Sequence, residues 1–128
     1  MLEANIEVNE NLVIKNNFSL EDAYKAGEKI VQMIEDECSI FCATDQLAIG
    51  VMRALHDAGV SIPKQAAIIG VDDIDASAYL TPSLSTIAIP KEEIGSKSAE
   101  MLIKLIEGKK VDNRQVLLEP ELIIRETT

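Results

Sequence analysis

The sequence predicts an α/β fold with an open, mainly parallel sheet flanked by helices. Short apolar stretches typical of strands alternate with longer stretches in which apolar residues recur every three or four positions, as on one face of a helix. The clearest strand, Ala66–Val71, has no polar side chain in six residues, which is typical of a strand buried on both faces of a parallel sheet. No repeat or long linker interrupts the 128 residues, so one small domain is expected.

The first strand and the first helix are predicted near the N-terminus. Leu12–Lys15 is a short strand candidate. Ser19, with Asp22 three residues later, resembles a capping box in which Asp replaces the usual Glu. Apolar residues then recur at helical spacing as far as Ile34, so a helix should follow this cap.

A second strand and a second helix lead into the buried strand. Ile40–Ala43 is the strand candidate, and Asp45 is the expected N-cap of the helix that follows it. Gly59 stands just past the last apolar residue of that helix, where a helix commonly ends. A turn then brings the chain to Ala66–Val71.

The last third of the chain contains one more strand, one more helix and an extended tail. Ser85–Ile89 is a strand candidate that stops at Pro90. Ile94–Ile106 has the apolar spacing of a helix, and Gly108 closes it. The tail is extended, and Pro120 indicates a bulge or the edge of a sheet.

Composition narrows the possible partners and the location. With 22 acidic and 12 basic residues the net charge is −10, so these residues provide no basic surface for a nucleic-acid backbone. Cys38 and Cys42 form no zinc or redox motif, as is usual in a reducing compartment. No segment approaches membrane-spanning length, and the N-terminus has no apolar signal-peptide region. A cytoplasmic protein without a membrane partner is expected.

One aromatic and several polar residues follow the predicted strands. Phe18 lies beyond the first strand, Thr44 and Asp45 beyond the second, and Asp72 and Asp73 beyond the third. Ligands of open parallel sheets bind outside the carboxyl ends of the strands. Carboxylates accept hydrogen bonds from vicinal hydroxyls, and an aromatic ring stacks on a sugar or a purine. These residues therefore suit a small polyol ligand.

Three of these residues also have a purely structural interpretation. Helix capping explains Asp45, an Asx turn would explain Asp72, and a hydrophobic staple would explain Phe18. Acidic residues at 72, 73 and 75 also permit a magnesium-dependent phosphoacceptor site, but its Lys and further acidic residues cannot be placed. No nucleophilic triad or glycine-rich phosphate loop can be assembled. No enzymatic activity, metal or cofactor is predicted.

Several stretches of the chain, taken in order, resemble the C-terminal half of LacI/GalR-family transcriptional regulators. These stretches are "NNFSLEDAYKAGEKI", "IFCATDQLAIGVMRALHDAGVSIPKQAAIIGVDDI", "YLTPSLSTIAIP" and "LLEPELIIRETT". The resemblance implies a periplasmic-binding-protein-like type I effector domain, in which two α/β subdomains close on a small molecule such as a sugar or a purine. Such regulators are typically cytoplasmic homodimers that bind operator DNA through an N-terminal helix-turn-helix.

The resemblance also implies roles for individual residues. Asp72 would accept hydrogen bonds from the effector, Phe18 would stack on it, and Thr44 would line the pocket. The residues implied at the dimer interface are Ile49, Tyr79 and Leu80.

The resemblance further implies that the chain is a fragment. Residues 1–128 would form a partial effector-binding domain, namely the C-terminal subdomain and a helix at 91–108 that packs on an absent N-terminal subdomain. No DNA-binding headpiece is expected, and the sheet should lack a strand between Leu12–Lys15 and Ile40–Ala43. The predicted function is effector sensing and dimerisation in a LacI/GalR-type regulator. The alternative is a solute-binding protein of the same fold that serves a transporter.

Overall fold

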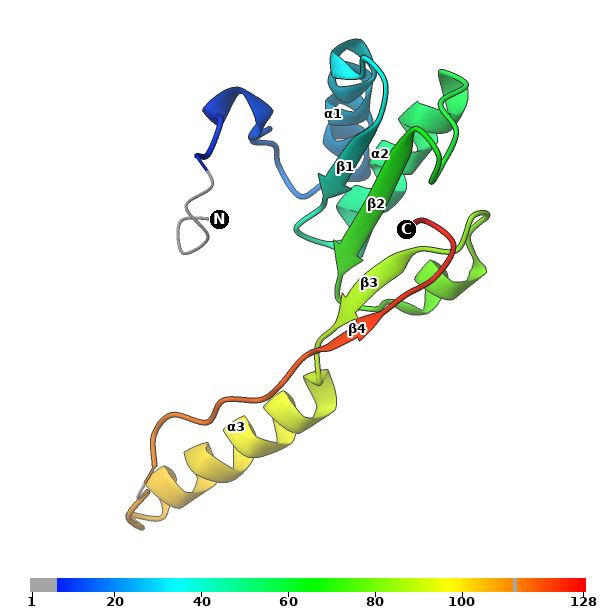
Figure 1. Cartoon of the computed structure of the whole chain (residues 1–128). Coiled ribbons are helices and arrows are strands. Elements are labelled where there is room, and N and C mark those ends of the chain that lie inside the picture. The colour runs from blue at the N-terminus through cyan, green and yellow to red at the C-terminus, as the bar shows by residue number, and fades with distance from the viewer. Residues whose placement is uncertain (1–6, 112) are drawn as a thin grey trace.

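The computed structural model describes residues 7–111 and 113–128 (Figure 1). Strands and helices alternate through most of the described chain, which confirms the predicted α/β class. The elements in order are the short 3₁₀ helix η2 (Glu10–Leu12), α1 (Leu20–Met33), β1 (Cys38–Phe41), α2 (Asp45–Asp57), β2 (Ala66–Val71), the 3₁₀ helix η3 (Asp75–Tyr79), β3 (Ser85–Ala88), α3 (Lys91–Ile106) and β4 (Glu121–Ile123).

The four strands form one open sheet in the order β1-β2-β3-β4. β1, β2 and β3 are parallel, with Phe41 opposite Ile69 and Gly70 opposite Thr86. β4 joins β3 in the antiparallel direction. The sheet is therefore mainly parallel, as predicted, and the C-terminal tail supplies its antiparallel edge. Because β1, β2 and β3 run the same way, their carboxyl ends lie along one edge of the sheet.

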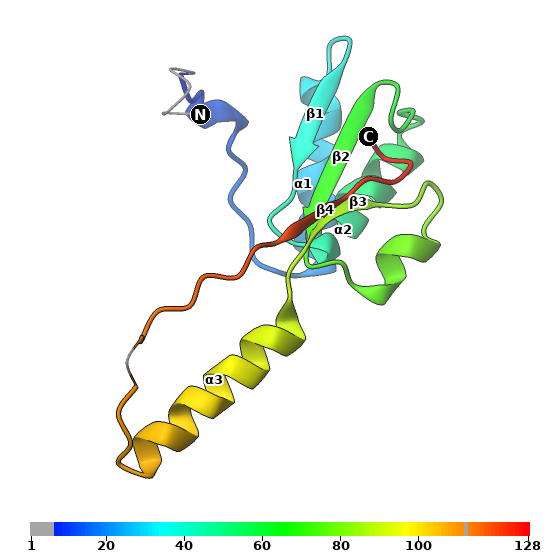
Figure 2. The ribbon, with the colours of Figure 1, turned by 60° about the horizontal axis from the view of Figure 1, so that its bottom comes forward.

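The core lies between the sheet and the helices α1 and α2, which pack on each other (Figures 1 and 2). A Cβ atom on Gly50 would lie 2.5 Å from the Ala23 Cβ, and one on Gly27 would lie 2.6 Å from the Ala54 Cβ. Glycine at these two positions therefore permits the close approach of the helices. The buried apolar residues of this core are Ala23, Cys42, Leu47, Ala48, Val51, Met52, Leu55, Ala66, Ile68 and Leu84.

The two core helices begin with different caps. The Ser19 hydroxyl accepts a hydrogen bond from the Asp22 backbone N–H at 3.1 Å, which confirms Ser19 as the N-cap. The Asp22 carboxylate accepts from the Ser19 hydroxyl at 2.9 Å and not from the Ser19 backbone N–H, so only half of the predicted capping box is formed. In α2 the N-cap is Thr44, whose hydroxyl accepts from the Leu47 N–H at 3.2 Å. The prediction that Asp45 caps this helix was wrong, because Asp45 is already the first helical residue.

The predicted strand at Leu12–Lys15 was also wrong. This segment contains the end of η2 and then continues without regular structure. A strand needs a hydrogen-bonded neighbour, and no described residue pairs with this segment in a sheet. The other strands and helices lie where they were expected, with ends shifted by a few residues, as is usual for element boundaries.

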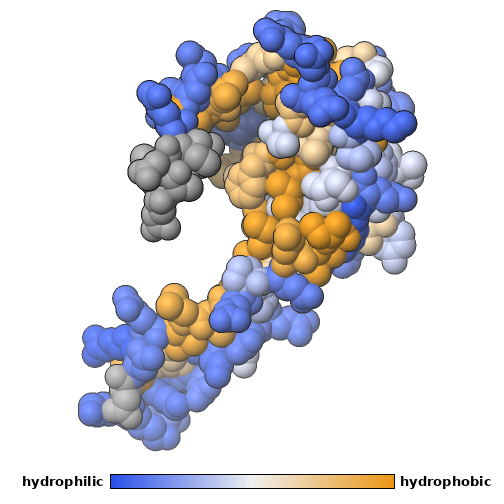
Figure 3. Space-filling view, in the orientation of Figure 1, coloured by the Kyte–Doolittle hydropathy of each residue, from blue (hydrophilic) through white to orange (hydrophobic). Residues whose placement is uncertain are grey.

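The helix α3 extends away from the rest of the fold (Figures 1 and 2). The helix begins directly after Pro90. None of its residues is buried, although it carries the large apolar side chains of Ile94, Leu102 and Ile106. Figure 3 shows apolar surface on the visible face of this helix, beside polar residues. No helix within the described residues is long and apolar enough to cross a membrane.

Candidate functional site

The predicted site residues lie around the carboxyl ends of the parallel strands. Thr44 lies three residues after β1, and Asp72 directly follows β2, at the same edge of the sheet. Phe18 precedes the cap of α1 and is 71% exposed. It lines a cavity of about 620 Å³ between the N-terminal segment, α1 and β1, together with Ile14 and Phe41. An exposed ring beside an apolar hollow is available for stacking.

Asp72 and Asp73 have a backbone conformation that is unusual for residues other than glycine. Their φ angles are +114° and +47°. The Asp72 N–H donates to the Ile87 carbonyl oxygen at 2.9 Å, and the Asp73 N–H lies 3.4 Å from the Thr86 hydroxyl. Such conformations are strained and persist only where the surroundings hold them in place.

The carboxylates of these two residues differ in their partners. Asp73 pairs with Arg125, whose Nη2 lies 2.7 Å from the Asp73 Oδ1. Arg125 also donates from Nη1 to the Leu84 carbonyl oxygen at 2.7 Å. The half-buried Asp72 carboxylate accepts no hydrogen bond from the described residues, so it forms no Asx turn there. Asp72 is thus the carboxylate that can accept hydrogen bonds from a ligand.

Asp45 has a different position from the one predicted. It is fully buried, and its carboxylate accepts hydrogen bonds from the Ile74 N–H at 3.0 Å, the Ser77 hydroxyl at 2.6 Å and the Thr86 hydroxyl at 2.5 Å. Both carboxylate oxygens are therefore bonded to β3, to η3 and to the residue before η3, and the cap of α2 is made by the preceding residue, Thr44. A Cβ on Gly70 would overlap the Asp45 Oδ1, so only glycine leaves room for this carboxylate.

Sequence reasoning did not identify Ser77, Thr86 or Arg125 as part of this arrangement. The available signal was the polar pair Ser85–Thr86 in a strand that otherwise reads as apolar. Both residues are fully buried, and buried hydroxyls require partners. Their partners lie 41 residues away at Asp45 and 42 residues away at Thr127, which no local pattern relates to this strand.

Cys42 lies in the same region but is not a reactive group. Burial, together with the nearby charge of Asp45, raises the pKa of the Cys42 thiol to about 12. A thiol with such a pKa stays neutral, and the thiolate is the nucleophilic form. Cys42 therefore packs as a small apolar side chain.

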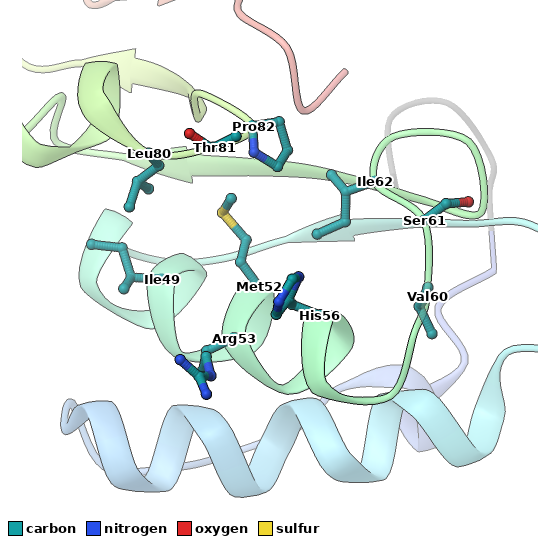
Figure 4. Close-up of a pocket in the computed structure, with 10 residues that line it drawn as sticks. All are labelled: Ile49, Met52, Arg53, His56, Val60, Ser61, Ile62, Leu80, Thr81 and Pro82. Carbon is teal, nitrogen blue, oxygen red and sulfur yellow. The ribbon is translucent and has the colours of Figure 1, made fainter.

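Two of the three predicted interface residues line a second hollow (Figure 4). Ile49 of α2 and Leu80, which follows η3, lie on its walls with Met52 and Pro82, and the cavity volume is about 450 Å³. Tyr79 does not line this hollow. It is 86% exposed and borders a smaller cavity beside Asp73 and Arg125.

The acidic residues after β2 do not assemble a metal site. Among the described residues, no group of three or more His, Cys, Asp or Glu side chains is arranged to hold a metal ion. Asp73, one of the residues that a phosphoacceptor site would use, is paired with Arg125.

Comparison with known proteins identifies the family. The family model for the periplasmic binding protein-like domain matches residues 1–128, and the chain belongs to that family. The "HTH-type transcriptional repressor PurR" of Vibrio vulnificus is 35% identical over 127 residues, which are 99% of this chain and 38% of the repressor. The chain thus spans less than half the length of this curated relative.

Solved structures agree with this assignment. The transcription regulator CcpA of Lactococcus lactis has a TM-score of 0.89 and 31% identity, over 99% of this chain and 46% of the regulator. A LacI-family transcriptional regulator from Enterococcus faecium with bound ribose has a TM-score of 0.78 and 33% identity, over 88% of this chain and 41% of that one. The LacI/GalR resemblance that the sequence motifs carry is confirmed, and these relatives are transcription regulators by their descriptions.

Proposed function

We propose that this chain is the effector-binding portion of a LacI-type transcriptional regulator, and that Asp72 is its main polar contact with the effector. The observation that carries the proposal is the Asp72 carboxylate, which accepts no hydrogen bond from the described residues, whereas the backbone N–H groups of residues 72, 73 and 74 are all bonded. A partly buried acceptor held in this way is a suitable partner for ligand hydroxyl or N–H groups.

The proposed effector is a small neutral molecule, either a sugar or a purine-like compound. Phe18 offers an exposed aromatic face, and Thr44 lies at the same sheet edge as Asp72. The neighbour from Enterococcus faecium is described with bound ribose, which favours the sugar class. In the intact regulator, effector binding would bias the protein between two arrangements of its DNA-binding segments.

Partners and location follow from the same proposal. Contact with operator DNA would be made by residues outside this chain, because the net charge of −10 disfavours a phosphate backbone here. A second copy of the chain would cover the hollow lined by Ile49 and Leu80, which is apolar and lies beside the exposed Tyr79. A regulator of this kind works in the cytoplasm. The descriptions of the relatives favour regulation over the transport alternative.

Titration with D-ribose, and with hypoxanthine as a purine probe, tests the site. Binding by this chain should be weak, with a dissociation constant of about 1 mM or more, because one sheet edge contacts only part of a ligand. Amide NMR shifts should nevertheless change at Phe18, Thr44 and Asp72. Asp72→Asn should abolish these changes and leave the melting temperature within about 2 °C of the original.

Asp75→Asn is the matched control. Asp75 is exposed at the start of η3, three residues from Asp72, and carries the same charge. This variant should keep the ligand response. An Asp72→Asn variant that responds to ligand like the original chain would disprove the assignment.

A further inference from the structure

Asp45 connects three parts of the fold that meet beside the proposed effector site. It is the first residue of α2, and its Oδ1 accepts from the Thr86 hydroxyl of β3. Its Oδ2 accepts from the Ile74 N–H at 3.0 Å and from the Ser77 hydroxyl of η3 at 2.6 Å. Asp45 is 0% exposed, so it cannot touch an effector itself.

The residues that are hydrogen-bonded to Asp45 lie next to the turn formed by Asp72 and Asp73, the 72–73 turn. Asp72 and Asp73, with φ angles of +114° and +47°, lie between the last residue of β2 and Ile74. The Asp72 N–H is bonded to β3, and the Ile74 N–H is bonded to Asp45. The turn is thus fixed on both sides, while Arg125 holds the Asp73 side chain. Two adjacent non-glycine residues at positive φ would relax if one of these attachments were released.

We infer that Asp45 is a positioning residue that holds the 72–73 turn at positive φ and thereby aims the Asp72 carboxylate. The inference rests on the proposed function, because it is the effector that Asp72 is aimed at. Ser77 and Thr86 act in the same arrangement as the donors that keep the Asp45 carboxylate in place. Gly70 belongs to it because a larger residue would displace the Asp45 Oδ1.

A merely structural role predicts a different outcome from a positioning role. If Asp45 only adds stability, its replacement lowers the melting temperature but leaves the folded turn unchanged. If Asp45 positions the turn, the folded variant has an altered turn. Positive φ gives a strong intraresidue NMR cross-peak between the amide and Hα protons, so this geometry can be observed at Asp72 and Asp73 directly.

The test is Asp45→Asn in the full chain, compared with Asp57→Asn. Asp57 ends the same helix, is exposed and pairs with Arg53, so the control makes the same chemical change far from the turn. Asp45→Asn should lose the positive-φ cross-peak of Asp72 or Asp73, and hydrogen exchange at the Ile74 amide should become about tenfold faster or more. Asp57→Asn should retain both signals. A folded Asp45→Asn variant with both cross-peaks and unchanged exchange at Ile74 would overturn the inference.

Ser77→Ala provides a second variant should Asp45→Asn fail to fold. It removes one of the three hydrogen bonds to Asp45 and leaves the carboxylate in place. The amide shifts of residues 72–74 should differ from those of the original chain, and the positive-φ cross-peak of Asp72 or Asp73 should weaken. Unchanged shifts at these residues would overturn the inference.

The D-ribose titration separates this inference from the proposed function. Both Asp72→Asn and Asp45→Asn should lose the ribose response. If Asp72→Asn keeps the response, the effector assignment fails whatever the turn does. A second outcome is that Asp72→Asn loses the ribose response, while Asp45→Asn has an altered turn but still responds to ribose. In that case the effector site stands and the positioning role of Asp45 is overturned.

Discussion

At the scale of single residues, buried polar groups and glycine decide the geometry of the site. Gly70 lies on β2 opposite Thr86, beneath the carboxylate of Asp45. The absence of a side chain at this position is what allows Asp45 to reach the Thr86 hydroxyl. A residue that looks like an ordinary small strand residue is therefore required by a polar group far away in the sequence.

Gly70→Ala should destabilise the protein. The added methyl group overlaps the Asp45 Oδ1, and overpacking of this kind costs about 1–3 kcal/mol in the free energy of unfolding. Urea denaturation followed by circular dichroism measures it. Gly95→Ala is the control, because a Cβ at that position in α3 meets no atom within 4 Å. Equal stabilities of Gly70→Ala and the original chain would contradict the close packing described here.

At the scale of elements, the helix ends show how local signals compete. α1 follows its local signal, because Ser19 is the N-cap and its hydroxyl bonds to Asp22. At the start of α2, Thr44 and Asp45 are both good capping residues, and Asp45 is withdrawn into the core. Thr44, whose hydroxyl stays at the helix end and accepts from the Leu47 N–H, then makes the cap.

The N-cap interaction between Ser19 and Asp22 at the start of α1 should be sensitive to acid. Hydrogen bonds from the side chains of Ser19 and Asn17 lower the pKa of Asp22. Because the folded pKa lies below the unfolded one, the stabilisation is present above about pH 4 and is lost as the pH falls through the lowered value. Ser19→Ala removes the cap and should cost about 1 kcal/mol near pH 7.

Thermal unfolding across this pH range checks the prediction. The difference in melting temperature between the original chain and Ser19→Ala should shrink as the solution becomes more acidic. Ser96→Ala, at an exposed position inside α3, should show a small difference that does not depend on pH. A Ser19→Ala effect of the same size at about pH 7 and about pH 2 would rule out ionised Asp22 as its partner.

At the scale of the whole molecule, large apolar surfaces remain exposed. α3 has no buried residue, Phe41 of the edge strand β1 is 65% exposed, and the hollow beside Ile49 and Leu80 is apolar. Edge strands and apolar patches of this kind favour association with other chains.

We expect the chain to form a dimer through the hollow lined by Ile49 and Leu80. Light scattering at about 50 µM should give about twice the monomer mass of 14.0 kDa. Ile49→Lys should return the chain to a monomer, because it places a charge in an apolar contact. Leu117→Lys, at a residue that is 97% exposed and outside the hollow, should leave the dimer intact. A 14.0 kDa species for the original chain at this concentration would contradict the prediction.

Local patterns in the sequence were sufficient for most of the elements. The apolar run Ala66–Val71 is a strand, the cap at Ser19 starts a helix, and Gly59 and Gly108 follow helix ends at positive φ. These features depend on neighbours within a few residues, so a linear pattern contains the information. The position of Asp72 at the carboxyl end of a buried parallel strand was predictable for the same reason.

Only the tertiary structure decided which of the polar residues are engaged with each other. Asp45 reads as a cap, but three donors from distant segments draw it into the core. Asp72 and Asp73 read alike, but Arg125, 52 residues after Asp73, pairs with Asp73 and leaves Asp72 available. Leu12–Lys15 reads as a strand but has no neighbour to pair with in the described sheet. Hydrogen bonds and ion pairs between segments far apart in the chain depend on how the elements assemble, so the sequence determined the elements of this protein and the assembled fold determined its site.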